Sequence, residues 1–173
     1  AFPGVLPDIG NKQIRLSTPK GDIVFELFAD SAPQTVSNFL YLTDNTYYDG
    51  LTFHRRVEGF VIQGGDPKGT GSGGPGYRFP DELSDDALFE PLPQDHPIQK
   101  QSGDPLFWYR KGMVAMANSG PNTNGSQFFI MLEDYPLPKN YTIFGRVTSG
   151  MDVVDQIKVG DVAGHQLSCR QPG

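Results

Sequence analysis

Short runs in which apolar and polar residues alternate, each ended by Gly or Pro, constrain most strongly what this chain can fold into. Every second residue is apolar on both sides of the turn at residues 19–21. These residues are Ile14, Leu16, Ile23, Phe25 and Leu27. A period of two is typical of strands with one buried face. We therefore predict a hairpin whose apolar face packs against a core.

Turn-forming residues are frequent along the whole chain. Its 173 residues contain 21 Gly and 15 Pro, which favours many turns and short strands over long helices. Further apolar segments are predicted as strands. They are residues 51–57, 60–65, 113–117, 127–132, 142–147 and 164–171.

Two short helices are predicted between the strands. Ser31, followed by Pro33 and Gln34, has the pattern of a helix start with a capping box, and this helix should end near Asp44. Ser149 is predicted to cap a second helix, whose inner face carries Met151, Val154 and Ile157. Many short strands and two helices indicate a mainly β fold, an antiparallel barrel whose open ends the helices cover.

The length of the chain predicts a single domain that spans residues 1–173. Residues 1–11 are rich in Gly and Pro and are predicted to form an irregular arm. Residues 81–111 are predicted to form an extended, irregular loop insertion with a packed aromatic end at 107–109. The only Trp, Trp108, lies at that end, and the sequence leaves open whether it folds back toward a pocket.

Charge and cysteine content exclude several classes of protein. The net charge of -6 predicts repulsion from nucleic acid and from anionic membrane surfaces. No apolar run approaches the ~20 residues that span a bilayer. Cys169 is the only cysteine, so an intrachain disulfide is impossible and a cytoplasmic location fits. The sequence begins at Ala1, which is also compatible with removal of an export or targeting segment. Nothing suggests a dimer seam, and we expect a monomer.

Common cofactor and metal motifs are not supported. Residues 69–74 match G-x-G-x-x-G, but Pro75 and Gly76 follow where a dinucleotide-binding helix should begin, so we interpret the segment as a loop. His54, His96 and His165 lie at no metal-ligand spacing, so no metal site is expected. We interpret His54 as a hydrogen-bonded structural residue. Sequence order alone leaves a Ser-His-Asp triad open, although no Ser lies in a G-x-S-x-G elbow.

Two segments differ from the rest of the chain. The first, residues 53–66, places Arg55, Val57, Val61 and Gln63 on one strand face if Gly59 does not break the register. The pattern alone leaves a surface Arg and a functional Arg equally possible. The second, residues 116–130, predicts a turn rich in Asn, Gly and Ser. The neighbours at 128 and 129 then point to opposite faces, one filling the barrel and one lining a pocket.

These two segments resemble the signature stretches of the cyclophilin-type peptidyl-prolyl cis-trans isomerases, and the resemblance runs from about Gly21 to Ile157. It implies a closed eight-stranded antiparallel β-barrel capped by two α-helices. It also implies catalysis of rotation about Xaa-Pro peptide bonds during protein folding. Rotation breaks no bond, so no cofactor is implied. The expected partners are proline-containing peptides and unfolded or flexible protein segments.

The family's site residues carry over to matching positions of this chain. The catalytic Arg corresponds to Arg55, and Gln63 supports it. The remaining substrate-binding positions correspond to Phe60, Val61, Ala117, Asn118, Ser119, Gln127, Phe129, Leu137 and Tyr141.

The resemblance also shows departures. Val61 stands where many members have Met, and Tyr141 stands where many have His. The Trp that commonly precedes the residue matched to Leu137 is absent, and the loop is about one residue shorter. In the family a missing Trp implies weak cyclosporin binding, while isomerase activity can persist. Two alternatives remain open at this point. One is a domain that binds proline-containing segments without turnover, and the other is a chaperone that recruits clients through residues 81–111.

Overall fold

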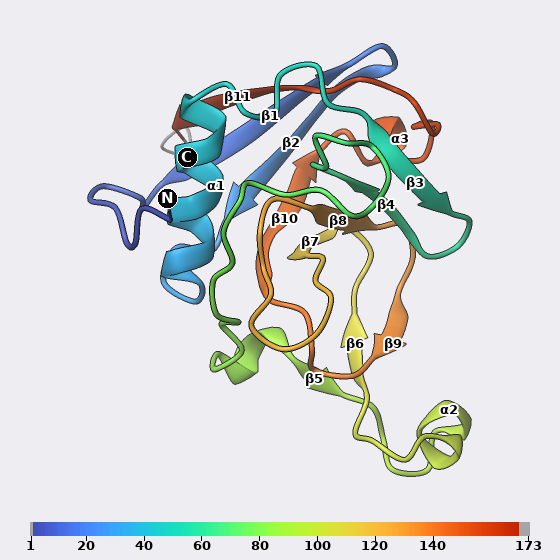
Figure 1. Cartoon of the computed structure of the whole chain (residues 1–173). Helices are drawn as coiled ribbons and strands as arrows, with labels where there is room; N and C mark the ends of the chain where they lie inside the picture. Colours follow the sequence, from blue (N-terminus) through green and yellow to red (C-terminus); the bar gives the residue numbers. More distant parts are fainter. Residues whose placement is uncertain (1, 170–173) are drawn as a thin grey trace.

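Eight antiparallel strands form one strongly curled sheet in the computed structural model, which describes residues 2–169 (Figure 1). The strand order is β11-β1-β2-β10-β7-β8-β4-β3. The strands are β1 (Lys12–Thr18), β2 (Gly21–Leu27), β3 (Phe53–Val57), β4 (Val61–Gly64), β7 (Met113–Met116), β8 (Phe128–Met131), β10 (Ile143–Ser149) and β11 (Gly164–Cys169). Each predicted strand is present, and its ends lie within two residues of the predicted ones. The end of the segment 164–171 lies outside the described residues.

The predicted hairpin is confirmed as β1 and β2. Thr18 pairs with Gly21 at its turn, and the chain reverses there because Gly21 adopts a φ of 128°. The alternating apolar residues are fully or almost fully buried inside the curled sheet. Burial of one strand face therefore follows the period-two pattern.

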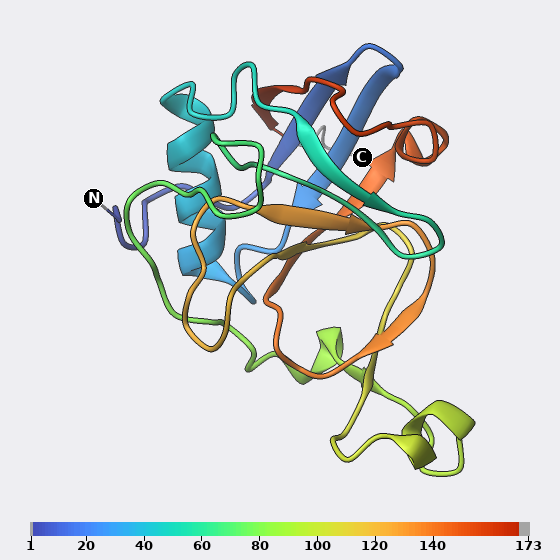
Figure 2. The same cartoon turned by 45° about the vertical axis from the view of Figure 1, so that its right-hand side comes forward.

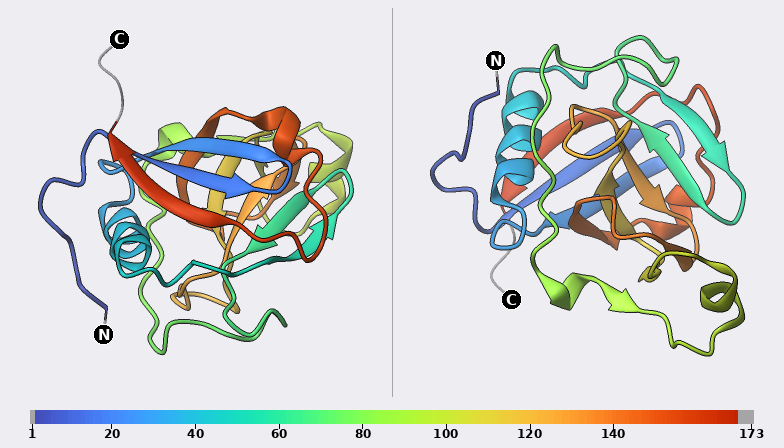
Figure 3. Two further views of the ribbon diagram at one scale, coloured as in Figure 1. Left: turned by 90° about the horizontal axis from the view of Figure 1, so that it is seen from above. Right: turned by 60° about the horizontal axis from the view of Figure 1, so that its bottom comes forward.

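The prediction of a closed barrel is overstated. The edge strands β3 and β11 approach each other, as the view from above shows (Figure 3), but no ladder joins them. The seam consists of a single bridge between Thr52 and Val162 and of hydrogen bonds from the segment just before β11. Phe53 N–H donates to Asp161 O at 2.9 Å, and Gly160 N–H donates to Phe53 O at 2.9 Å. The chain passes β3 before it enters β11, so the two strands meet only at this point.

Helix α1 (Pro33–Asp44) lies against the curled sheet beside β1 and β2 (Figure 1), and it begins differently from the prediction. Its N-cap is Ala32, which forms no side-chain cap, and Ser31 instead donates a hydrogen bond to the Asp85 carboxylate. The first-turn N–H groups of Gln34 and Thr35 donate to Glu82 at 3.1 and 2.6 Å. A carboxylate from a distant segment therefore satisfies the helix start, where negative charge is favourable.

The second predicted helix is confirmed as α3 (Met151–Val154), but Ser149 does not cap it. Its N-cap is Gly150, which has a φ of 92°. A side chain at this position would place a Cβ only 2.3 Å from Asp22 O, so the turn between β10 and α3 requires glycine.

The stretch 81–111 is not irregular throughout. It contains a 3-10 turn at Asp86–Leu88, strands β5 (Glu90–Pro91) and β6 (Phe107–Tyr109), and a third helix, α2 (Pro97–Gln101). The part of the chain described here thus has three α-helices rather than the two expected. Strand β9 (Tyr135–Leu137) completes a second sheet in the order β5-β6-β9. Helix α2 projects from the body of the molecule (Figures 1 and 2).

Trp108 does not fold back toward a pocket. It pairs with Pro136 across β6 and β9, and Arg110 lies over its ring at 4.9 Å.

No helix within residues 2–169 has the length and apolarity needed to cross a membrane.

Two apolar cores lie on opposite faces of the central strands. The first fills the inside of the curled sheet and the space under α1, and Phe128 belongs to it. The second lies on the other face of β4, β7 and β8, and Phe129 belongs to it. The prediction that these two neighbouring residues point to opposite faces of the sheet is thus confirmed.

His165 lies in the first core, only 8% exposed, and stacks on the ring of Tyr48 at 4.3 Å. Burial lowers the pKa of its imidazole from 6.5 to about 3. The unfolded chain takes up a proton as pH falls through about 6.5, whereas the folded chain keeps this ring neutral. Between these two pKa values, the free energy of unfolding should fall by about 1.4 kcal/mol for each unit of falling pH.

We therefore expect His165→Phe to make folding less sensitive to acid. In urea unfolding at pH 7 and pH 5, the unchanged protein should lose about 2 kcal/mol more than this variant. His96→Asn removes an imidazole from the exposed insertion and should behave like the unchanged protein. An equal loss in His165→Phe and in the unchanged protein would show that another group causes the acid sensitivity.

Candidate active site

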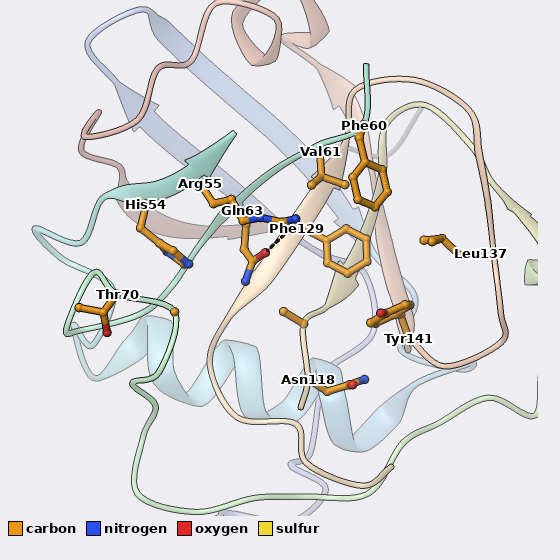
Figure 4. A pocket seen from close by; sticks show the side chains of 12 residues that line it. His54, Arg55, Phe60, Val61, Gln63, Thr70, Asn118, Phe129, Leu137 and Tyr141 are labelled. Carbon is orange, nitrogen blue, oxygen red and sulfur yellow. Dashed lines mark hydrogen bonds between the residues drawn. The ribbon is translucent and has the colours of Figure 1, made fainter. Parts of the chain in front are cut away.

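A pocket of about 480 Å³ opens beside β3, β4 and β8 (Figure 4). Nine of its lining residues were predicted as site residues. They are Arg55, Phe60, Val61, Gln63, Ala117, Asn118, Phe129, Leu137 and Tyr141. Two further predicted residues, Ser119 and Gln127, do not line it. The lining also contains His54, Thr70 and Gly71, which were not predicted to belong to it.

Strand pairing brings the polar centre of the pocket together. Arg55 lies opposite Gln63 across β3 and β4, and Gly59, with a φ of 71°, makes the turn without disturbing this register. The Arg55 guanidinium donates to Gln63 Oε1 at 3.1 Å. Gln63 Nε2 donates to Gln127 Oε1 at 3.0 Å, so Gln127 orients Gln63 although it does not itself line the pocket. The expectation that Arg55 and Gln63 share a strand face is thus confirmed.

An apolar end lies next to this polar centre (Figure 4). Val61 and Phe129 form its floor and are 1% and 5% exposed. Phe60, Leu137 and Tyr141 form its walls, and the rings of Phe129 and Tyr141 meet edge to face at 5.5 Å. Such a cavity can bind a compact apolar group but offers few polar contacts to it.

The turn after β7 forms another side of the pocket. Asn118 Nδ2 donates to Asn140 O at 2.8 Å, and its Oδ1 accepts from Gly120 N–H at 3.2 Å. Ser119 uses its backbone N–H to bind Thr123 Oγ1 at 2.9 Å and is itself exposed. Within this turn, Ala117 and Asn118 face the pocket, while Ser119 shapes the turn.

His54 lines the pocket because the strand is irregular at this residue. The β3–β4 register shifts between Phe53 and Arg55, so His54 is an extra residue in the ladder. In a regular strand the neighbours 54 and 55 would point to opposite faces, and such a bulge brings both toward one side. The interpretation of His54 as hydrogen-bonded is wrong, because neither ring nitrogen has a partner in the described part of the chain. Burial lowers the pKa of its imidazole below 6.5, so the ring is neutral at pH 7.

The glycine-rich loop after β4 closes the pocket on the side of His54, and Asp66 organises it. This carboxylate is 1% exposed and accepts backbone N–H groups of Lys68, Thr70 and Gly71 at 2.6–3.0 Å. Burial raises the pKa of Asp66, but the hydrogen bonds from backbone N–H groups outweigh it, and the pKa lies below its usual value. Asp66 is therefore ionised at neutral pH.

This loop is coupled to the polar centre through Gln127. Gln127 Nε2 donates to the carbonyl oxygens of Gly71 and Gly73, both at 2.9 Å. A continuous set of contacts thus runs from Asp66 through the loop to Gln127, Gln63 and Arg55. The sequence signal for it was a single Asp before a run of Gly, because Asp readily accepts backbone N–H groups that follow it.

No group of three or more His, Cys, Asp or Glu side chains that could bind a metal occurs among the residues with described side chains. The chemical resources of the pocket are one guanidinium, the amides that orient it, a neutral imidazole and an apolar cavity.

Comparison with known proteins decides the family. The profile of the family described as cyclophilin type peptidyl-prolyl cis-trans isomerase matches residues 13–170. The chain belongs to this family. A peptidyl-prolyl cis-trans isomerase of Arabidopsis thaliana is 47% identical over 146 residues, which cover 82% of this chain and 79% of that protein. A Helicobacter pylori peptidyl-prolyl cis-trans isomerase is 43% identical over 150 residues, covering 85% of this chain and 80% of the relative.

Solved structures agree with this cyclophilin assignment. A cyclophilin-type isomerase of Cryptosporidium parvum superimposes with a TM-score of 0.72 at 33% identity, covering 94% of this chain and 99% of that one. A second structure of that protein, determined in the presence of the dipeptide Ala-Pro, gives a TM-score of 0.71 at 32% identity and covers 92% and 99%. The chain is accordingly an isomerase of the cyclophilin type.

The coupling through the glycine-rich loop can be tested with two neighbouring glycines. A Cβ at Gly73 would lie 1.9 Å from Asp66 Oδ1, whereas a Cβ at Gly74 meets nothing within 4 Å. We expect Gly73→Ala to displace Asp66 or the loop, to lower the free energy of unfolding by about 1–3 kcal/mol and to slow isomerisation several-fold.

Gly74→Ala should leave both properties nearly unchanged. Thermal unfolding and a proline-isomerisation assay on the two variants measure the effects. Equal activity of both folded variants would contradict a coupling between the loop and the polar centre.

Proposed function

We propose that this pocket binds an Xaa-Pro segment with the proline ring in the apolar end, and that Arg55 catalyses rotation about the Xaa-Pro bond. The observation that carries the proposal is a guanidinium fixed at the edge of an apolar cavity. Gln63 accepts one of its N–H groups at 3.1 Å. In the described part of the chain this side chain makes no other hydrogen bond, which leaves further N–H donors available to a bound peptide.

The chemistry requires only that the enzyme favour the twisted amide. The barrier to rotation is about 18–20 kcal/mol because resonance gives the C–N bond partial double-bond character. Twisting ends this resonance and localises a lone pair on the proline nitrogen. Arg55 donates to that nitrogen or to a neighbouring carbonyl oxygen, an interaction that is stronger in the twisted state than in either planar state. Each ~1.4 kcal/mol of this difference accelerates rotation about tenfold.

The other pocket residues bind and orient the substrate. The proline ring fits the apolar end, where Val61 and Phe129 remove it from water. The turn at Asn118 lies where it can bind the peptide backbone on one side of the rotating bond. Gln63 and Gln127 fix the position of the guanidinium. The Ala-Pro dipeptide present with the Cryptosporidium parvum relative supports a proline-containing substrate.

Replacement of Arg55 provides the most direct test. We expect Arg55→Ala to slow catalysed exchange about a hundredfold, because the group that favours the twisted state is lost while the apolar end stays intact. Arg15→Ala removes an equal charge from an exposed ion pair with Asp22 and serves as the control. NMR exchange spectroscopy of a short Ala-Pro peptide measures the rate for each protein.

Acceleration that survives in Arg55→Ala would move catalysis to another group. No acceleration by the unchanged, folded chain would favour the alternative of a domain that binds proline-containing segments without turnover.

The pH dependence of catalysis provides a second test. Arginine stays protonated throughout the working range. Burial lowers the pKa of His54 below 6.5, so the protonation state of this ring does not change as pH rises above that value either. We therefore expect a nearly constant rate from about pH 6.5 to 9 in the same peptide assay. A bell-shaped profile over this range would show that a titrating group takes part in the reaction.

A further inference from the structure

The outer wall of the pocket is not part of the main sheet. Leu137 ends β9, and Tyr141 follows it in the segment that leads to β10. Strand β9 pairs only with β6 in the described topology, and β6 belongs to the insertion 81–111. Phe107 lies opposite Leu137 in this pairing. The insertion therefore provides the neighbouring strand for the wall that faces the proposed proline site.

Tyr109, the last residue of β6, makes the most specific contact with this wall. Its side chain is fully buried, and its ring meets Tyr141 edge to face at 6.1 Å. Its hydroxyl donates to Tyr141 O at 3.0 Å, with Pro138 O as a longer alternative at 3.4 Å. The same hydroxyl oxygen accepts the Tyr141 N–H at 3.3 Å. One side-chain hydroxyl thus binds both backbone polar groups of a pocket residue.

The wall is held from the pocket side as well. Asn118 Nδ2 donates to Asn140 O at 2.8 Å, so the backbone at 138–141 lies between a donor from the substrate-binding turn and the hydroxyl of Tyr109. Removal of that hydroxyl would leave backbone groups of Tyr141 without this partner, which favours a different position of the wall. Burial raises the pKa of the Tyr109 hydroxyl well above 10, so it remains a donor at every working pH.

We propose that Tyr109 is a positioning residue for substrate binding: its hydroxyl fixes the backbone at Pro138–Tyr141 and thereby sets the width of the apolar end between Leu137, Tyr141 and Phe129. This inference rests on the proposed function of the pocket. It assigns the insertion a part in substrate affinity and leaves the guanidinium of Arg55 and its supporting amides untouched. The effect of losing the hydroxyl should consequently fall on binding and not on the rate of the bound substrate.

Tyr109→Phe tests the inference because it keeps the buried ring and removes only the hydroxyl. NMR titration and exchange spectroscopy with an Ala-Pro peptide give both the dissociation constant and the exchange rate at saturation. We expect the dissociation constant to rise about fivefold, as for the loss of one buried hydrogen bond. The rate at saturation should stay within about twofold of the unchanged chain.

Tyr77→Phe is the matched control. Its hydroxyl donates to Asn38 Oδ1, and the ring packs against the first core, so its loss should cost stability without weakening peptide binding. An unchanged dissociation constant in folded Tyr109→Phe, or an equal rise in Tyr77→Phe, would overturn the inference. A fall in the saturated rate with unchanged binding would overturn it too.

Amide hydrogen exchange of the unchanged chain provides a measurement that depends neither on folding of the variant nor on activity. Because the Tyr141 N–H donates to the Tyr109 hydroxyl, this amide should exchange slowly, and rapid exchange would overturn the inference. If the unchanged chain accelerates no exchange, the proposed catalysis fails. The role of Tyr109 is then decided by the Tyr141 amide and by the dissociation constants alone.

Discussion

The pairing of β4 with β3 on one side and β8 on the other is the constraint on which the candidate site depends. It places Gln63 opposite Arg55 and also opposite Phe129. The amide that orients the guanidinium and the ring that forms the apolar floor are therefore adjacent without any loop having to place them. A slip of one residue in either register would turn each of these side chains to the other face of the sheet. Because the inner face is filled by the first core, that slip would also expose core residues to water.

A buried charge fixes the parts of the site that strand pairing does not reach. Asp66 lies almost fully out of water, a state that is unfavourable for a carboxylate unless hydrogen bonds compensate for the lost hydration. Its lowered pKa shows that the backbone donors of the glycine-rich loop outweigh the desolvation. These donors hold the loop in a conformation in which Gly71 and Gly73 present carbonyl oxygens to Gln127. The glycines matter because a Cβ at Gly73 would collide with the carboxylate.

Regular strand segments could be predicted from the sequence, and their positions followed from the period of two. Arg55 and Gln63 share a face, and Phe128 and Phe129 divide between two cores, because each lies in an uninterrupted part of a strand. His54 could not be placed in this way, since the register shifts at this residue and the alternation fails.

Contacts between segments far apart in the sequence could not be predicted, because no local pattern of residues indicates them. The free backbone N–H groups at the start of α1 are bound by Glu82, which lies 47 residues beyond Thr35. The nearby Ser31, which the sequence pattern indicated as the cap, does not bind them. The strands of the insertion have two or three residues each, too few to show an alternation. β6 pairs with β5 on one side and on the other with β9, which lies outside the insertion. Closure of the barrel was overstated for the same reason. The seam depends on the path of residues 160–163 past β3, which no pattern within either segment reveals.

The two halves of the pocket are built in different ways, and in the proposed mechanism this separates the rate of rotation from the affinity for the substrate. The half with Arg55 belongs to the main sheet, where neighbouring strands and Asp66 limit its movement, as an interaction specific to the twisted amide requires. The opposite wall belongs to a small sheet whose strands come from an insertion and from the segment before β10. A wall that contacts the proline ring in the planar and twisted states alike contributes equal binding to both. In the proposed mechanism, changes in the insertion therefore alter how tightly a segment binds, and which segments bind, while the guanidinium and its supports keep the geometry on which the rate of rotation depends.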